Sequence, residues 1–242
     1  MRYFIQLSYD GTNYHGWQVQ PNATSVQQTL NEALSTILRQ PIATTGAGRT
    51  DTGVNAKMMV AHFDVGNEVD ENQLTDKLNR LLPHDIAIQH IKRVENEAHA
   101  RFDAKLRTYH YDIMLVKNPF KRHYATRLYF QLDFGKMNQA AKMLIGTKDF
   151  TSFSKTGTDT KTNICTITRA CWTELEPGYW RFEISADRFL RNMVRAIVGT
   201  LIQVGKGRLT PEEVSNIIEK KDRCAAGESV PAKGLSLADI QY

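Results

Sequence analysis

Apolar residues recur along this chain with two different periods, and this constrains the fold more than any other feature of the sequence. Residues 3–9 alternate between apolar and polar, which is typical of a strand with one buried face. Residues 25–39 carry an apolar stripe at helical spacing, and Ser25 with Gln28 predicts a capping box at the start of that helix. The chain therefore mixes strands and helices from its first forty residues onward.

The remaining periodic segments continue this pattern. They predict strands at 57–65, 86–94, 106–116, 163–176, 179–186 and 235–241, and helices from Asp70, around 137–145, at 187–204 and from Thr210. The first half follows a split βαβ order, and the second half repeats it loosely. We expect an α+β fold of two similar split-βαβ halves, ferredoxin- or RRM-like, whose antiparallel sheets form a central cleft. The expected domains are 1–105 and 106–242.

Composition narrows the class of protein only modestly. Hydrophobic residues make up 41% of the 242 residues, which is too many for a disordered chain. Lysine and arginine number 31 against 26 aspartates and glutamates, giving a net charge of +5. An anionic partner fits this balance, although many basic proteins bind no nucleic acid. No apolar run approaches the ~18 residues of a membrane span, so we expect no membrane association and a cytoplasmic location.

Cysteine and histidine give no sign of a metal site. The three cysteines, Cys165, Cys171 and Cys224, include no Cys-x-x-Cys pair, and the seven histidines lack metal-ligand spacing. Reduced thiols and an intracellular setting are therefore expected. Cys165 and Cys171 are six residues apart on a predicted strand, so they should face the same side of the sheet.

A glycine-containing loop holds the strongest candidates for catalytic residues. Gly46, Gly48 and Gly53 allow tight turns and close approach to a ligand, and Arg49 and Asp51 lie between them. A carboxylate beside an arginine stays ionised at neutral pH, as a nucleophile must. The same pair can instead tie down a turn, and spacing alone favours that structural interpretation.

Aromatic and basic residues gather at two further places. The strand at 106–116 puts Tyr109 and Tyr111 on the face that Arg107 shares, which suits base stacking or, equally, core packing. The helix at 187–204 carries three arginines at helical spacing on its polar side, with no acid to pair with them: Arg188, Arg191 and Arg195. Such a face is usually solvated, but an anion or a buried carboxylate is a reasonable partner.

Six short motifs occur in a fixed order over nearly the whole chain. They are Tyr9-Asp10-Gly11-Thr12-Asn13-Tyr14-His15-Gly16-Trp17-Gln18, Gly48-Arg49-Thr50-Asp51-Thr52-Gly53-Val54, His99-Ala100-Arg101-Phe102, Asp149-Phe150-Thr151-Ser152-Phe153, Met193-Val194-Arg195 and Gly234-Leu235-Ser236-Leu237. Together they resemble the motifs of the tRNA pseudouridine synthase A family. Each piece alone is weak, but the ordered set is specific.

The resemblance implies a role for particular residues. Asp51 matches the nucleophilic aspartate, and Arg195 matches the basic residue that pairs with it. Tyr111 matches the tyrosine that stacks on the target base, and Arg49 an arginine that assists base flipping. Two segments match tRNA-binding positions: Ala100, Arg101, Phe102, Asp103 and Ala104, then Gly157, Thr158, Asp159, Thr160 and Lys161.

The resemblance also implies a substrate and an assembly. The family isomerises uridines 38, 39 and 40 in the anticodon stem and loop of tRNA, works as a homodimer, and needs neither cofactor nor metal. This chain departs from the family at two places in the motif. The family usually has Ala or Ser where Thr52 stands and often has His where Asn55 stands, which puts the bracing of the loop in question.

Two other functions fit parts of the same pattern. A non-catalytic RNA-binding module would also show the split βαβ order and the strand aromatics. A hydrolase acting on a sugar-like substrate would need a second carboxylate beside Asp51, and within the motif segments Asp103 is the candidate. The ordered set of motifs favours the RNA-modifying isomerase over both.

Overall fold

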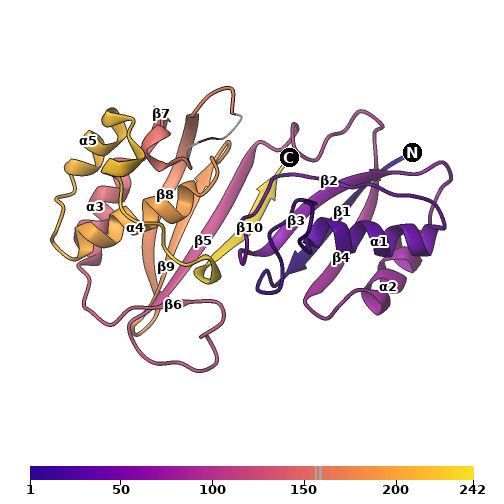
Figure 1. Ribbon diagram of the computed structural model, residues 1–242, viewed down its shortest axis with the longest axis horizontal. Coiled ribbons are helices and arrows are strands. Elements are labelled where there is room, and N and C mark those ends of the chain that lie inside the picture. Colours follow the sequence, from indigo (N-terminus) through magenta and orange to yellow (C-terminus); the bar gives the residue numbers. More distant parts are fainter. Residues whose placement is uncertain (156, 158–159) are drawn as a thin grey trace. The chain divides into compact units, whose positions relative to one another are not determined.

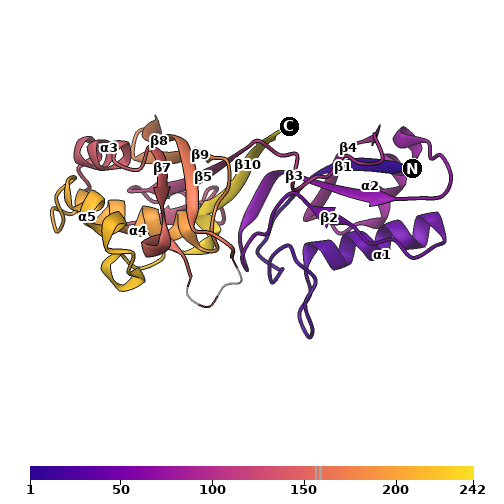
Figure 2. The same cartoon turned by 90° about the horizontal axis from the view of Figure 1, so that it is seen from above.

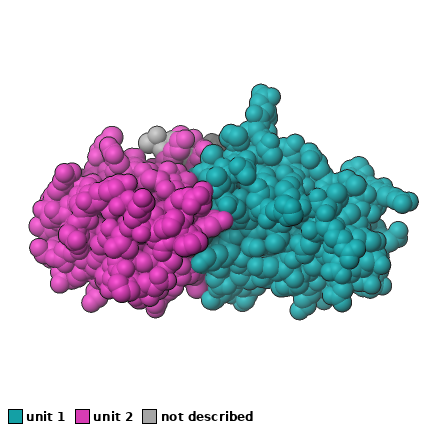
Figure 3. Space-filling model, turned by 90° about the horizontal axis from the view of Figure 1, so that it is seen from below, with its two compact units in different colours: residues 1–105, 236–242 teal, residues 106–235 magenta. Residues whose placement is uncertain are grey.

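The computed structural model describes residues 1–155, 157 and 160–242. It divides into two compact units, coloured separately in Figure 3. The first unit comprises Met1–Lys105 and Ser236–Tyr242, and the second comprises Leu106–Leu235. These units are defined by contacts within the chain, and the domain limits 1–105 and 106–242 stay a prediction.

The first unit joins strands and helices in alternation. Its elements are β1 (Arg2–Tyr9), α1 (Val26–Leu38), β2 (Thr45–Gly46), β3 (Asn55–Asp64), α2 (Glu71–Leu81), β4 (Ile86–Val94) and β10 (Leu235–Gln241). The strands lie in the order β4-β1-β3-β10, and β2 pairs with β3. The α1 and α2 helices lie side by side (Figure 1), and α1 runs along one face of the strands (Figure 2).

The strand pairing of this unit brings distant parts of the sequence together. β1 is antiparallel to both β3 and β4, whereas β10 runs parallel to β3. The backbone N–H of Lys105 donates to the carbonyl of Gln241 at 2.8 Å. The last strand of the chain therefore completes the unit that the first 105 residues begin.

The start of α1 forms only half of the predicted capping box. Ser25 Oγ accepts a hydrogen bond from the Gln28 backbone N–H at 3.2 Å, as expected of an N-cap. The Gln28 side chain, however, donates to Glu32 Oε1 at 3.0 Å instead of returning to Ser25. A partner one helical turn ahead thus replaces the reciprocal bond.

The second unit is also built from antiparallel strands and helices. Its elements are β5 (Leu106–Met114), β6 (Thr126–Arg127), α3 (Phe134–Lys142), β7 (Gly146–Asp149), η1 (Thr151–Phe153), β8 (Ile164–Glu176), β9 (Tyr179–Ala186), α4 (Met193–Gly205), α5 (Glu213–Lys220), η2 (Arg223–Ala225) and η3 (Ala232–Gly234). The order β5-β9-β8-β7 is antiparallel throughout, while β6 pairs in parallel with β5. With both units described, the α+β fold class is confirmed.

The helix predicted at 187–204 begins later than its periodicity indicates. Asn192 has φ of 66°, a left-handed conformation that cannot belong to a right-handed helix, and α4 starts at the next residue. Before it, the Asp187 carboxylate accepts hydrogen bonds from the Thr166 and Arg188 backbone N–H groups. Arg188 and Arg191 therefore lie before the helix, and the prediction of a helical face with three arginines is wrong.

A β-bulge overturns the prediction for the two neighbouring cysteines. The register of β8 against β9 shifts between Ile167 and Arg169. Cys165 is buried, whereas Cys171 is only partly covered and pairs opposite Glu183. One extra residue inverts the side-chain alternation beyond it, so the two thiols face opposite sides of the sheet.

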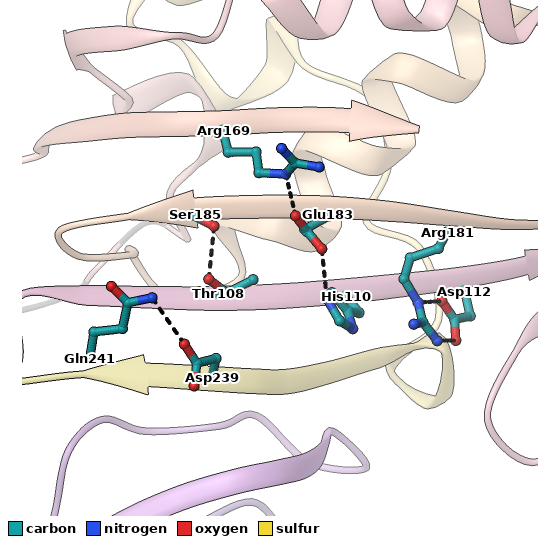
Figure 4. Close-up of polar contacts among 9 residues, drawn as sticks. All are labelled: Thr108, His110, Asp112, Arg169, Arg181, Glu183, Ser185, Asp239 and Gln241. Carbon is teal, nitrogen blue, oxygen red and sulfur yellow. Dashed lines mark hydrogen bonds and ion pairs between the residues drawn. The ribbon is translucent and has the colours of Figure 1, made fainter. Parts of the chain in front are cut away.

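One face of the β5-β9-β8 sheet carries polar side chains that pair across the strands, as Figure 4 shows. Asp112 receives two hydrogen bonds from the Arg181 guanidinium, at 2.7 and 2.8 Å, and a third from the Tyr179 hydroxyl at 2.6 Å. The carboxylate raises the pKa of the Arg181 guanidinium, chiefly through these bonds. On the same face Glu183 bridges Arg169 and His110.

We expect Asp112→Ala to lower the free energy of unfolding by about 2–3 kcal/mol, because it leaves Arg181 largely buried without a counter-ion. Arg169→Ala is the matched control, since the Arg169 side chain is 59% exposed. Its loss should change the free energy by no more than about 0.5 kcal/mol. Urea unfolding of both variants measures the difference, and equal effects would contradict this account of the sheet.

Candidate active site

The loop that carries Asp51 is held by the segment that follows β1. The Trp17 backbone N–H donates to the Thr50 carbonyl at 3.3 Å, and the Gly53 N–H donates to the Tyr14 carbonyl at 3.2 Å. The Tyr9 hydroxyl and Thr50 Oγ1 are 2.9 Å apart in a buried hydrogen bond. Backbone and side-chain bonds on both sides of Asp51 thus fix the path of the loop.

Two glycines make this close approach possible. Gly16 has φ of +89°, and a Cβ atom at this position would lie 2.3 Å from the Thr50 carbonyl oxygen. Gly53 has φ of +74°, a backbone conformation that residues other than glycine rarely adopt. Gly46 and Gly48 do not have positive φ, so the requirement for backbone freedom falls on only one of the three loop glycines.

Asn55, where the chain departs from the family motif, has a definite role in the loop. Its Oδ1 atom accepts a hydrogen bond from the Gly11 N–H at 2.8 Å, and the residue is only 7% exposed. An amide oxygen therefore satisfies a buried backbone donor. Thr52, the other departure, is exposed and leaves this bracing intact.

Asp51 itself is half-buried, and Arg49 beside it is exposed. The Asp51 carbonyl accepts a hydrogen bond from the Val54 N–H at 3.1 Å, which closes a turn around the residue. The carboxylate thus sits on a rigid turn while part of the residue remains accessible. The roles of Asp51 as nucleophile and of Arg49 in base flipping stay predictions.

Tyr111 lies in the second unit, on β5, with 0% of its side chain exposed. Its hydroxyl donates to the Pro231 carbonyl at 3.0 Å. Since a carbonyl only accepts, the single phenolic proton is used there, and Thr126 Oγ1, 2.7 Å away, must donate to the Tyr111 oxygen. Burial raises the pKa of the Tyr111 phenol, while the Thr126 bond and the charge of Arg195 lower it. The ring is held neutral in one orientation.

Arg195 is anchored to the same segment of chain as Tyr111. Its Nε atom donates to the Val230 carbonyl at 2.7 Å, and the Val230 N–H donates to the Arg195 carbonyl at 3.2 Å. Val230 and Pro231 thus hold Arg195 and Tyr111 respectively. Of the three residues predicted to form the catalytic group, the structure brings these two together within one unit, and Asp51 belongs to the other.

The first predicted tRNA-binding segment alternates between anchored and accessible residues. Ala100 and Ala104 are buried, whereas Arg101, Phe102 and Asp103 are exposed. Phe102 is 76% exposed, and the Arg101 guanidinium carbon lies 5.9 Å from the centre of its ring. An accessible ring beside a cation suits contact with a nucleic acid.

Of the second predicted segment, Thr158 and Asp159 lie outside the described residues. Thr160 Oγ1 donates to Asn163 Oδ1 at 3.1 Å, and Gly157 and Lys161 are exposed. In the part of the chain that the structure describes, no three His, Cys, Asp or Glu side chains gather as a metal site would require. Nor does any helix of these residues have the length and apolar character needed to span a bilayer.

Comparison with known proteins assigns the chain to a family. Residues 6–103 and 140–242 match the family model described as tRNA pseudouridine synthase. The chain belongs to the tRNA pseudouridine synthase family. Its members are isomerases that act on tRNA, so the predicted family and enzyme class are confirmed.

Full-length relatives support the same assignment. The tRNA pseudouridine synthase A of Bacteroides thetaiotaomicron is 56% identical over 243 residues, covering 100% of this chain and 90% of that protein. The protein of the same name from Porphyromonas gingivalis is 54% identical over 244 residues, covering 100% and 97%. That from Bacillus subtilis is 41% identical over 246 residues, covering 100% and 99%.

Sequence reasoning missed the residues that hold the predicted site residues in place. Thr126 and Val230 are far from Tyr111 and Arg195 in sequence, and nothing in the local pattern links them. The sequence shows Asn55 as a departure from the family motif but gives no sign of its bond to Gly11. The segment that braces the Asp51 loop is visible in the sequence as the Tyr9–Gln18 motif. The motif does not, however, predict that its backbone contacts that loop.

We expect Gly16→Ala to lower the free energy of unfolding by about 2 kcal/mol or more, because the added methyl collides with the Thr50 carbonyl at a left-handed position. Gly48→Ala is the control, since a Cβ there meets nothing within 4 Å. It should change the free energy by about 0.5 kcal/mol at most. Denaturant unfolding, with hydrogen exchange of the Gly53 amide, tests both; an undisturbed loop in Gly16→Ala would refute the bracing.

Proposed function

We propose that this protein isomerises uridine to pseudouridine at positions 38, 39 and 40 in the anticodon stem and loop of tRNA, with Asp51 as the nucleophile. Membership of the family supports the reaction and the class of substrate. The observation that carries the assignment of Asp51 is the braced loop, in which a half-buried carboxylate stands on a turn closed by Val54 and held by Trp17.

The chemistry requires little more than a positioned carboxylate. In the isomerisation the N1–C1′ bond breaks, the uracil ring turns, C5 bonds to C1′, and the proton lost from C5 is replaced by one at N1. The Asp51 carboxylate acts at C1′, by attack or by assisting departure of the base, while the sugar stays in place. A rigid turn suits this task because it fixes the carboxylate relative to the sugar.

In this proposal Asp51, Arg195 and Tyr111 converge in a central cleft between two similar split-βαβ halves. Arg195 pairs with Asp51, so that a cation lies opposite the carboxylate in the proposed site. Tyr111 stacks on the flipped base, a contact worth about 1–3 kcal/mol. Because its ring is fully covered in the structure, the base must displace what covers it.

Binding of the tRNA is assigned to the exposed segments. Arg49 assists extrusion of the target nucleotide, which costs a few kcal/mol and less in a loop than in a helix. Residues 100–104 and 157–161 contact the tRNA. We further propose that the protein is cytoplasmic, and that it works as a homodimer without cofactor or metal, as the family resemblance implies.

The two other functions are less well supported. A hydrolase would need a second carboxylate beside Asp51, but Asp103 Oδ2 accepts a hydrogen bond from the His99 N–H at 2.7 Å and so serves its own loop. A binding module without catalysis would leave the braced Asp51 unexplained. Incubation with unmodified tRNA, followed by mapping of pseudouridine at each position, separates an enzyme from a module.

We expect Asp51→Asn to lower the rate of pseudouridine formation by at least about a thousandfold, because the amide keeps the shape of the side chain but is not a nucleophile. The affinity for tRNA should stay within about threefold. Asp76→Asn, an exposed change on α2, should retain full activity. A single-turnover assay measures the rates, and an active Asp51→Asn would remove the nucleophile assignment.

We expect Arg101→Ala to weaken tRNA binding and to reduce the slope of log affinity against log salt by about one, because one phosphate contact is lost. Arg80→Ala removes an exposed arginine on α2 and should alter neither quantity. Filter binding at a series of salt concentrations provides the measurement. If the two variants bind alike, residues 100–104 do not contact the tRNA.

A further inference from the structure

The exposed residues of the predicted tRNA-binding segment are held by a buried histidine on β3. The Ala100 backbone N–H donates to His62 Nδ1 at 3.2 Å. His62 is only 6% exposed, so this donor is shielded from water and the imidazole is the partner that the structure gives it. Ala100 is the residue directly before Arg101 and Phe102, so its position sets where both side chains leave the surface.

A second histidine continues the same pattern. His99 Nδ1 accepts from the backbone N–H groups of Arg101 and Phe102, at 3.1 and 3.3 Å. The His99 ring also stacks on Phe102, with centroids 4.2 Å apart, and meets His62 edge-on at 4.6 Å. Imidazole Nδ1 atoms therefore accept three consecutive backbone donors, at residues 100, 101 and 102.

The other side of Ala100 is fixed as well. The Tyr242 hydroxyl donates to the Ala100 carbonyl at 2.8 Å. His62 thus holds the donor of this residue, and Tyr242 holds its acceptor. A residue clamped at both polar groups, with 0% of its surface exposed, has little freedom to shift.

The hydrogen bond to Ala100 exists only while His62 Nδ1 carries no proton, because a protonated imidazole donates at both nitrogens. Burial lowers the pKa of His62, Arg2 and His99 lower it further, and Asp64 and Asp103 act in the opposite direction. The net shift is downward, so the fold itself favours the accepting form at neutral pH.

We propose that His62 is a positioning residue for tRNA binding, which as a neutral acceptor for the Ala100 N–H holds Arg101 and Phe102 in the orientation that meets the RNA. The inference rests on the proposed contact between residues 100–104 and tRNA. It assigns His62 no part in the chemistry at Asp51.

A dependence on pH follows from the direction of the His62 shift. The unfolded side chain has a pKa of about 6.5, and the folded one titrates below that. The hydrogen bond is complete at neutral pH and is lost as the pH falls through the lowered pKa of the folded His62, because the proton then occupies the accepting nitrogen. Binding of tRNA should weaken over the same range.

The test compares two replacements of His62. His62→Asn places an amide oxygen near the former Nδ1 and preserves the acceptor, whereas His62→Leu fills similar space without one. We expect His62→Leu to bind unmodified tRNA about tenfold more weakly, because it leaves a buried donor unpaired. His62→Asn should bind within about twofold of the wild type. The single-turnover rate at saturating tRNA should be unchanged in both.

The outcomes separate this inference from the function on which it rests. If Arg101→Ala weakens binding and His62→Leu does not, the positioning role is overturned while the tRNA contact survives. If Arg101→Ala has no effect, the proposed contact itself fails. A fall in the saturating single-turnover rate of His62→Leu, or a His62→Asn that binds as weakly as His62→Leu, would also overturn the role.

A second measurement does not depend on whether His62→Leu folds. The dissociation constant for tRNA is measured for the wild type and for His62→Asn at pH 7.5 and at a series of lower pH values at which both proteins stay folded. We expect the wild type to lose several-fold more affinity between these values, because Asn has no proton to gain and the groups that face His62 are present in both proteins. Equal losses would overturn the proposal.

Discussion

The site in the first unit depends on two segments of the backbone, around Gly16 and Thr50, that are in contact with no side chain between them. At Gly16 the chain passes so close to the Thr50 carbonyl that even a methyl group would collide with it. The hydrogen bonds from Trp17 and Gly53 can form only at this separation. The position of Asp51 is therefore set by main-chain geometry, which varies less than side-chain packing and suits a group that must act on one particular carbon.

In the second unit, the predicted site residues are held by hydrogen bonds from their side chains to the backbone. Two adjacent carbonyls, of Val230 and Pro231, receive the Arg195 guanidinium and the Tyr111 hydroxyl. Movement of either side chain would break its hydrogen bond to one of these carbonyls. A single stretch of irregular chain thus coordinates a cation and an aromatic ring that come from a helix and a strand. Carbonyl acceptors are well suited to this because they hold donors without adding charge of their own.

Regular periodicity predicted most of the long elements, including β4 and β10 at their observed limits. It failed where one residue breaks the period, as Asn192 does before α4 and the bulge does in β8. For the site, the motifs pointed to Asp51, Tyr111 and Arg195 through resemblance, and spacing alone left each of them open. The residues that support them were not predictable, because Thr126 and His62 look like ordinary strand residues until the fold brings them to their partners.

The return of β10 to the first unit bears on the order in which the protein is made. Lys105 and Ala100 are both bonded to the end of this strand, through Gln241 and Tyr242. During synthesis, residues 106–235 are made before β10, so the unit that contains Asp51 cannot complete its sheet until the end of the chain has been made. Such long-range pairing slows folding, and an incomplete sheet leaves an open edge on β3 in the meantime.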